Sequence, residues 1–175
     1  MRESIKFIKK NFLGIDRGLI GAEVGVRAGA NALDMLKTLP IENLYLIDHY
    51  EPHTEHSGLE IIAWDQKNFY QQMIKCIEPY KELVEIVKKD SIEASKKFPD
   101  EFFDFVYIDA GHRYGEVLRD LDAWFPKVKK NGIFCGHDFN NKCTPEVKDA
   151  VKDFFNLKNI AIYNLGDIDW ITIKE

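Results

Sequence analysis

The chain has 175 residues, of which 45% are hydrophobic and 30% are charged, and its formal net charge is −5. This composition is typical of one globular domain and excludes a disordered chain. The negative charge disfavours nonspecific binding to a nucleic-acid backbone. The three cysteines lack metal-site or redox-motif spacing, and no apolar run approaches the length of a membrane span. We therefore expect a cytoplasmic protein with reduced thiols and without a nucleic-acid or membrane partner.

Apolar periodicity predicts one domain over residues 1–175, in which 1–18 form a helical N-terminal extension. Five strand–helix pairs follow, and two final strands without an intervening helix are expected to pair antiparallel. The first strand ends within residues 22–25, and the later strands are predicted at 44–47, 83–87, 102–108, 133–135, 160–163 and 170–173. Helices are predicted at 4–12, 32–39, 65–79, 92–98, 114–128 and 144–155. This order predicts an α/β fold: a Rossmann-like, doubly wound, mostly parallel seven-stranded sheet with a C-terminal antiparallel hairpin.

The stretch from Glu23 to Gly29 is a glycine-bearing turn between a buried strand and a helix. Asp48 follows about twenty residues after the glycines, where nucleotide-binding units carry an acid for the ribose hydroxyls. A dinucleotide fingerprint needs a middle glycine so that the backbone can approach a pyrophosphate, but Arg27 stands at that position. The turn favours a ligand with a ribose and no pyrophosphate, such as S-adenosylmethionine. The alternative interpretation, a tight strand-to-helix connection with no ligand, also remains open.

Four aspartates each fall just past the end of a predicted strand, namely Asp48, Asp90, Asp109 and Asp138. One such aspartate is usually a helix cap or a turn residue. Ligands of open parallel sheets bind outside the carboxyl ends of the strands, however, and all four carboxylates are expected at that edge. Their number indicates a ligand site there.

Two segments carry a resemblance to a known family. The first is Ile108-Asp109-Ala110-Gly111-His112-Arg113-Tyr114, followed by Asp120-Leu121, and the second is Asn131-Gly132-Ile133 with Gly136-His137-Asp138-Phe139. With these motifs the chain, over roughly 20–155, resembles the class I S-adenosylmethionine-dependent methyltransferases, and within them the small group of the "methyltransferase domain 24" type.

The resemblance implies S-adenosylmethionine as cofactor and a small-molecule acceptor, with a hydroxyl oxygen favoured. The implied cofactor-binding residues are Glu23, Gly25, Arg27, Gly29, Asp48, His49, Asp90, Ser91 and Asp109. The loop from Glu23 to Gly29 would face the methionine portion. Asp48 would accept hydrogen bonds from the ribose, and Asp90 with Ser91 would lie near the adenine amino group.

Methyl transfer to a hydroxyl needs an aligned acceptor and removal of its proton. The catalytic candidates are Asp109, His112 and His137. One device for lowering the acceptor's pKa is a divalent cation, with Mg²⁺ favoured, at Asp109 and Asp138, with His137 and Asn140 as further candidate ligands. The other device is a histidine base. Both stay open.

Two other functions compete with methyl transfer: an NAD-type oxidoreductase, which Arg27 disfavours, and a noncatalytic protein that binds an adenosyl cofactor. The polar segment from His49 to Trp64, which also holds His53 and His56, is interpreted as a flap near the cofactor rather than a zinc site. Because the chain adds few elements around the predicted sheet, we expect an open site or a homodimer.

Overall fold

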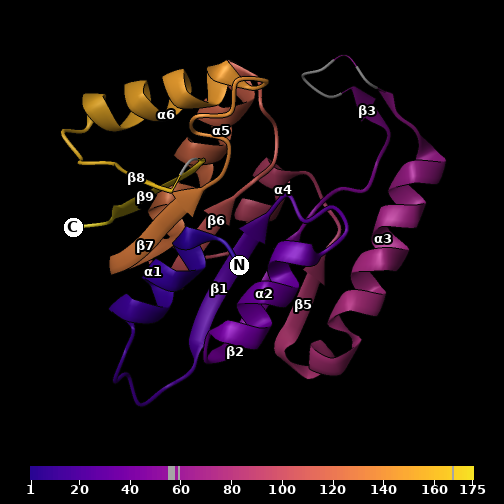
Figure 1. Cartoon of the computed structure of the whole chain (residues 1–175), viewed down its shortest axis with the longest axis horizontal. Helices are drawn as coiled ribbons and strands as arrows, with labels where there is room; N and C mark the ends of the chain where they lie inside the picture. Colours follow the sequence, from indigo (N-terminus) through magenta and orange to yellow (C-terminus); the bar gives the residue numbers. More distant parts are fainter. Residues whose placement is uncertain (55–57, 59, 167) are drawn as a thin grey trace.

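The computed structural model describes residues 1–54, 58, 60–166 and 168–175, without the side chain of Trp64. A seven-stranded sheet with helices on both faces forms its body (Figure 1). The sheet strands are β1 (Leu19–Val24), β2 (Ile41–Ile47), β5 (Val84–Val87), β6 (Phe103–Ile108), β7 (Val128–Gly136), β8 (Tyr163–Leu165) and β9 (Asp169–Ile173). The helices are α1 (Glu3–Asn11), α2 (Ala30–Thr38), α3 (Ala63–Ile77), α4 (Ser91–Ser95), α5 (Tyr114–Trp124) and α6 (Pro145–Leu157). A separate ribbon pairs β3 (His53–Thr54) with β4 (Glu60–Ile61).

The strand order of the sheet is β5-β2-β1-β6-β7-β9-β8. Strand β1 pairs in parallel with both β2 and β6, whereas β9 runs antiparallel to β7 and β8. The chain therefore winds outward from β1 in one direction and from β6 in the other, which makes the β1–β6 boundary the topological switch point. The predicted doubly wound sheet with its antiparallel C-terminal hairpin is confirmed.

Two apolar cores bury the two faces of the sheet. Helices α1, α2 and α3 cover one face, with Ile5, Met35 and Met73 in the core, and α4, α5 and α6 cover the other, with Trp124 and Phe155 (Figure 1). Every residue of β6 is buried, as expected for a central parallel strand covered on both faces. The packed cores hold the carboxyl ends of the strands in fixed positions.

Several predicted boundaries differ from the structure. The helix expected over 114–128 ends at Trp124, because Pro126 cannot continue it and a short 3-10 turn at Phe125–Lys127 takes its place. Strand β7 then begins at Val128, and its register shifts opposite β6, so that the turn predicted at 131–132 is an irregularity inside the strand. The strand expected at 160–163 lies later, at Tyr163–Leu165. No helix in the described ranges is long and apolar enough to cross a membrane.

Candidate active site

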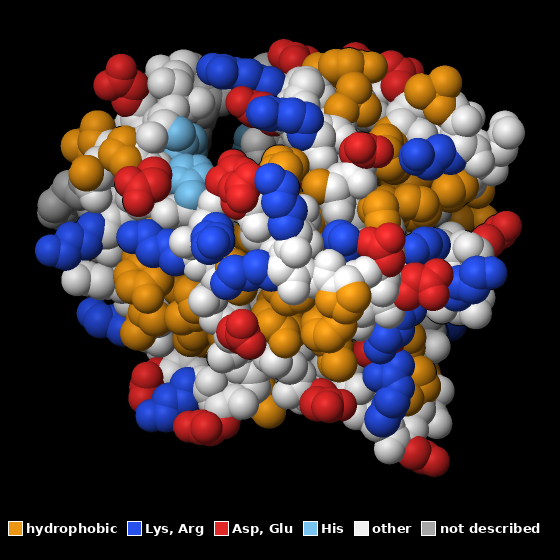
Figure 2. All heavy atoms as spheres, turned by 180° about the vertical axis from the view of Figure 1, so that it is seen from behind, with side chains coloured by type: hydrophobic (Ala, Val, Ile, Leu, Met, Phe, Trp, Pro, Cys, Tyr) orange, Lys and Arg blue, Asp and Glu red, His pale blue; other side chains and the backbone are white. Residues whose placement is uncertain are grey.

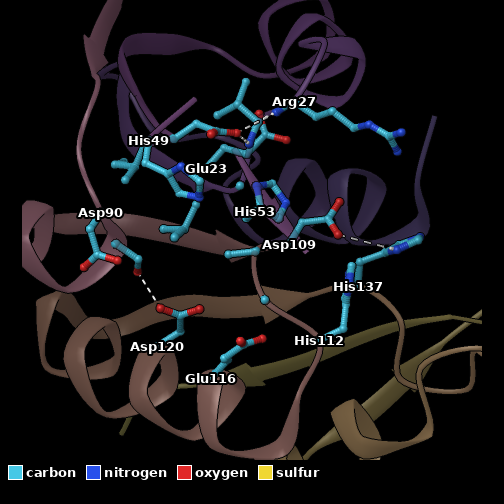
Figure 3. A pocket seen from close by; sticks show the side chains of 18 of the residues that line it. Glu23, Arg27, His49, His53, Asp90, Asp109, His112, Glu116, Asp120 and His137 are labelled. Atoms are coloured by element: carbon cyan, nitrogen blue, oxygen red, sulfur yellow. Dashed lines mark hydrogen bonds and ion pairs between the residues drawn. The ribbon is translucent and has the colours of Figure 1, made fainter. Parts of the chain in front are cut away.

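A cavity of about 550 Å³ opens beyond the carboxyl ends of β1, β2, β5, β6 and β7. Figure 2 shows a hollow on this face with histidine side chains at its wall, and Figure 3 shows the residues that line the cavity. One end holds Asp90 and Asp120, and the other holds His112 and His137 (Figure 3). The glycine loop that follows β1 lies between them. The cavity thus spans the switch point, where ligands of such sheets bind.

The loop after β1 is shaped by left-handed backbone at Gly25, Arg27 and Gly29, whose φ angles are 87°, 51° and 81°. A Cβ at Gly25 would lie 2.1 Å from the carbonyl oxygen of Asp109, so only glycine allows the loops after β1 and β6 to touch. Arg27 adopts the left-handed conformation without being glycine. Its guanidinium carbon lies 4.8 Å from the centre of the Phe69 ring, so the side chain packs on α3.

Asp48 holds this loop in place. Its Oδ2 accepts hydrogen bonds from the backbone N–H groups of Val26 and Arg27 at 3.0 and 2.9 Å, and its Oδ1 accepts from Tyr50 at 3.0 Å. A carboxylate has about four acceptor positions. The predicted ribose-binding acid therefore also organises the loop, and a ribose would share its oxygens with the backbone.

Glu23 at the end of β1 is 1% exposed and accepts a hydrogen bond from the Asn31 amide at 2.9 Å on Oε1. Its Oε2 and the Asn31 Oδ1 are buried without a partner among the described residues. Burial raises the pKa of Glu23 to about 8, although the Asn31 hydrogen bond opposes this. Two unsatisfied buried acceptors beside the glycine loop fit the ammonium group of a bound amino acid, which offers three donors.

Asp90 and Ser91, predicted near an adenine amino group, line the other end of the cavity but have structural partners. Asp90 caps α4, because its Oδ1 accepts from the backbone N–H groups of Ile92 and Glu93 at 2.9 and 3.3 Å. The Ser91 hydroxyl donates to Asp120 Oδ1 at 2.5 Å. Asp120 is a cavity residue that the sequence reasoning missed.

At the opposite end, Asp109 forms an ion pair with an unexpected partner from the N-terminal extension. Nη1 of Arg2 lies 3.0 Å from Asp109 Oδ2 and also donates to the Tyr107 hydroxyl. Burial raises the pKa of Asp109 above its usual value, and the Arg2 and His137 charges counteract this shift. Buried Asp169 anchors the start of α1, because its Oδ2 accepts from both the backbone N–H and the hydroxyl of Ser4.

The structure brings the predicted catalytic residues His112, His137 and Asp109 together around Asp138. Asp138 Oδ2 lies 3.0 Å from His112 Nε2, and its Oδ1 lies 3.1 Å from His137 Nδ1, which is 3.8 Å from Asp109 Oδ1. Burial disfavours the charged form of Asp138, but hydrogen bonds from His112, His137 and Asn141 hold its pKa well below the usual value. Asp138 also has a φ of 64°, a strained conformation that is common at functional sites.

Asp109, His137 and Asp138 offer one ligand atom each within 4.8 Å of one another. This mixed oxygen and nitrogen set fits a divalent cation. The further ligand suggested at Asn140 is disfavoured, because its Oδ1 accepts a hydrogen bond from Lys148 at 2.9 Å. The neighbouring Asn141 contacts Asp138 instead, donating through its amide nitrogen at 2.7 Å.

The segment after β2 contributes His49 and His53 to the cavity wall, with their ring centroids 5.1 Å apart. Tyr50, which lies in the segment interpreted above as a flap, is buried, and its hydroxyl donates a hydrogen bond to the Arg27 carbonyl. It fixes the glycine loop rather than facing a ligand. His56 and the Trp64 side chain lie outside the described residues.

The sheet order and the cavity over its switch point define a Rossmann-like methyltransferase fold. The sequence model of the Methyltransf_24 family, described as a methyltransferase domain, matches residues 22–139. This range is more than half of the chain, and the chain belongs to this family. Membership confirms the predicted resemblance and implies S-adenosylmethionine as the methyl donor. A search of curated protein sequences found no significant match.

Solved structures with the same fold include the O-methyltransferase NovP, with a TM-score of 0.73 and 16% identity over 98% of this chain and 78% of that one. A Staphylococcus aureus protein assigned as a caffeoyl-CoA O-methyltransferase has a TM-score of 0.72 and 13% identity over 100% and 84%. A spermidine synthase has a TM-score of 0.68 and 14% identity over 99% and 61%. At these identities the likeness shows the fold alone.

Proposed function

We propose that this chain transfers the methyl group of S-adenosylmethionine to a hydroxyl oxygen of a small-molecule acceptor. The observation that carries the proposal is the cluster of Asp109, His112, His137 and Asp138 at one end of a cavity whose middle is the glycine loop. Two solved structures with this fold bear the names of O-methyltransferases acting on a caffeoyl-CoA and a TDP-rhamnose. Their names support a hydroxyl acceptor by analogy of fold.

The residues around the loop would bind the donor along the carboxyl edge of the sheet. S-adenosylmethionine supplies a methyl group that its sulfonium already activates. Glu23 and Asn31 would take the ammonium, because they carry the unsatisfied acceptors, and Asp48 would accept from the ribose hydroxyls. Gly25 and Gly29 let the backbone approach, and His49 lies beside the ribose position. Asp109 would place its negative charge near the sulfonium.

The histidine cluster would hold the acceptor and remove its proton. Because His137 Nδ1 lies 3.8 Å from Asp109 Oδ1, we assign His137 as the base that receives the hydroxyl proton while the acceptor oxygen takes the methyl group. Asp138 would orient His137 through Nδ1 and stabilise the imidazolium that results. His112 would hold the second oxygen of Asp138.

A metal-assisted version of the same reaction is a second candidate, supported by the ligand set of Asp109, His137 and Asp138. A divalent cation there, such as Mg²⁺, would lower the pKa of the acceptor hydroxyl. In that case His137 would be a ligand, and His112 would be the remaining imidazole near the acceptor. The two versions differ in their response to chelation: only the metal-assisted reaction loses its rate in the presence of EDTA.

The first test is calorimetric titration with S-adenosylhomocysteine, S-adenosylmethionine and NAD, each with and without Mg²⁺. We expect micromolar binding of both adenosyl ligands and its loss in Asp48→Ala. Binding of NAD alone would favour the oxidoreductase alternative. Adenosyl binding without turnover of any hydroxyl acceptor would favour a noncatalytic cofactor-binding protein.

A further inference from the structure

A partly buried chain of hydrogen bonds joins α4 to α5 at the end of the cavity away from His112 and His137. The indole nitrogen of Trp124 donates to the Ser91 hydroxyl at 2.8 Å, and this hydroxyl donates to Asp120 Oδ1 at 2.5 Å. A serine hydroxyl has one proton to donate. Ser91 is therefore committed to Asp120, and its role is to fix the direction of that carboxylate.

Asp120 is only 5% exposed, yet it lines the cavity. Figure 3 shows Asp120 at the same end of the cavity as Asp90, with its carboxylate joined by a hydrogen bond to the Ser91 hydroxyl. Since Ser91 occupies Oδ1, the oxygen left for a ligand is Oδ2, and no hydrogen bond between described residues uses it. Asp120 thus presents one acceptor to whatever fills this end.

Asp90 is less suited to the same task. It is exposed, and its Oδ1 already accepts two backbone N–H groups at the start of α4. Withdrawing this oxygen would uncap the helix. Of the two carboxylates at this end, the one with an uncommitted oxygen inside the protein is Asp120.

The environment of Asp120 also calls for a donor. Burial raises its pKa to about 6, against the Ser91 hydrogen bond, and Asp90 and Glu116 add negative charge while Arg119 adds positive charge. A buried carboxylate with one hydrogen bond is incompletely satisfied. The exocyclic amino group of a purine base would donate an N–H to this carboxylate. A carbonyl oxygen at the same position of the base would instead place a second acceptor against it.

We infer that Asp120 is the specificity-determining residue for the base of the cofactor, accepting the adenine amino proton on Oδ2 and disfavouring a 6-oxo purine. The inference rests on the proposed function, because it places the base at the end of the cavity opposite His112 and His137. A site built to bind a donor rejects an analogue that lacks it, since its own acceptor is then left unpaired.

The test is the ratio of two affinities measured by calorimetry: that for S-adenosylhomocysteine over that for its deaminated analogue S-inosylhomocysteine. In the unaltered protein we expect a ratio of about tenfold or more. Asp120→Asn keeps an acceptor for Ser91 and replaces the second oxygen with an amino group. We expect this variant to bind the adenosyl ligand more weakly and the inosyl ligand more tightly, which brings the ratio to about threefold or less.

Two matched variants separate this role from general effects of charge. Glu116→Gln removes one negative charge one helical turn earlier on α5, and Asp90→Asn removes the charge of the capping residue; neither should change the ratio. An unchanged ratio in Asp120→Asn, a collapse in Asp90→Asn, or equal affinities in the unaltered protein would overturn the inference. If Asp120→Asn does not fold, Ser91→Ala takes its place and must lower the ratio, because it releases the carboxylate. Absence of adenosyl binding in the unaltered protein would instead overturn the proposed function.

Discussion

Arg2 and Asp109 form an ion pair of 3.0 Å, although 107 positions separate them in the sequence. Arg2 also donates a hydrogen bond to the Tyr107 hydroxyl, 105 positions away. Asp169 and Ser4 fix the start of α1, which holds the Arg2 guanidinium at the end of the cavity that contains His112 and His137. The N-terminal extension therefore contributes a permanent cation to the carboxylate beside which the sulfonium and any metal would bind.

Removing this cation should strengthen metal binding. Two positive charges roughly 6 Å apart repel by about 3 kcal/mol at an effective dielectric constant of about 20. Arg2→Ala is therefore expected to bind Mn²⁺ about a hundredfold more tightly than the unaltered protein in calorimetry or electron paramagnetic resonance. Arg2→Lys and the surface variant Lys6→Ala should show little change. Weaker or equal binding in Arg2→Ala would show that Arg2 does not oppose a metal.

Glu23 should make the ligand-free protein less stable as the pH rises. Its folded-state pKa of about 8 lies above the ordinary value of 4.5, so between these values the folded protein keeps a proton that the unfolded chain releases. The free energy of unfolding then falls with rising pH over this range. Asp48 and Asp109 disfavour the Glu23 charge, while Arg2 and the Asn31 amide favour it.

The variant Glu23→Gln removes the titration and should separate stability from binding. At pH 8 it should melt higher than the unaltered protein, and at pH 5 the two should be nearly equal. Its affinity for S-adenosylhomocysteine should fall about tenfold or more, because a neutral amide replaces a charged partner of the ammonium. Thermal melts at both pH values and calorimetry check this. A variant that is less stable at pH 8 would contradict the pKa shift.

Gly25→Ala should disrupt the cavity with little change elsewhere. The new Cβ would lie 2.1 Å from the Asp109 carbonyl oxygen, on a residue with a φ of 87°. We expect a loss of about 2 kcal/mol or more in the free energy of unfolding, with loss of adenosyl binding. Gly115→Ala is the matched control, because nothing lies within 4 Å of its added Cβ in α5. Equal effects of the two substitutions would argue against the tight contact.

The two histidines should differ in their contributions to rate. His137→Ala is expected to lower kcat by about 10² to 10⁴-fold once an acceptor is known, whereas the Kd for S-adenosylhomocysteine should change less than about threefold. His112→Ala should lower kcat less, because His112 acts through Asp138. The reverse order, together with inhibition by EDTA, would favour the metal-assisted version.

The order of the elements and the edge that carries the site could be predicted from the sequence, because strand–helix alternation brings the ends of parallel strands together. That is how Asp48, Asp109 and Asp138 were found. Contacts between distant segments could not: nothing in the helical spacing of 4–12 places Arg2 beside Asp109. A helix cap is a usual role of an aspartate after a strand, but the sequence did not show which of the four aspartates has that role, and the structure gives it to Asp90.

Asp120 did leave a signal in the sequence. It shares one face of α5 with Val117, Leu121 and Trp124, all of them buried. An acid on an otherwise apolar face is costly to bury unless it is paired, so such a residue deserves a functional explanation. The 3.6-residue period predicts the helix, and the polar exception on its buried face identifies Asp120 as the residue that needs a functional explanation.

The contact of Gly25 with the Asp109 backbone has a practical consequence for protein engineering. Because the loop after β1 and the loop after β6 touch at this point, neither can be lengthened or exchanged without moving the other. A redesign for a different acceptor should leave both loops unchanged. Two other parts of the cavity wall can be replaced. One is Arg2, which precedes α1 and pairs with Asp109, and the other is the ribbon of β3 and β4, which contributes His53 and Ile61.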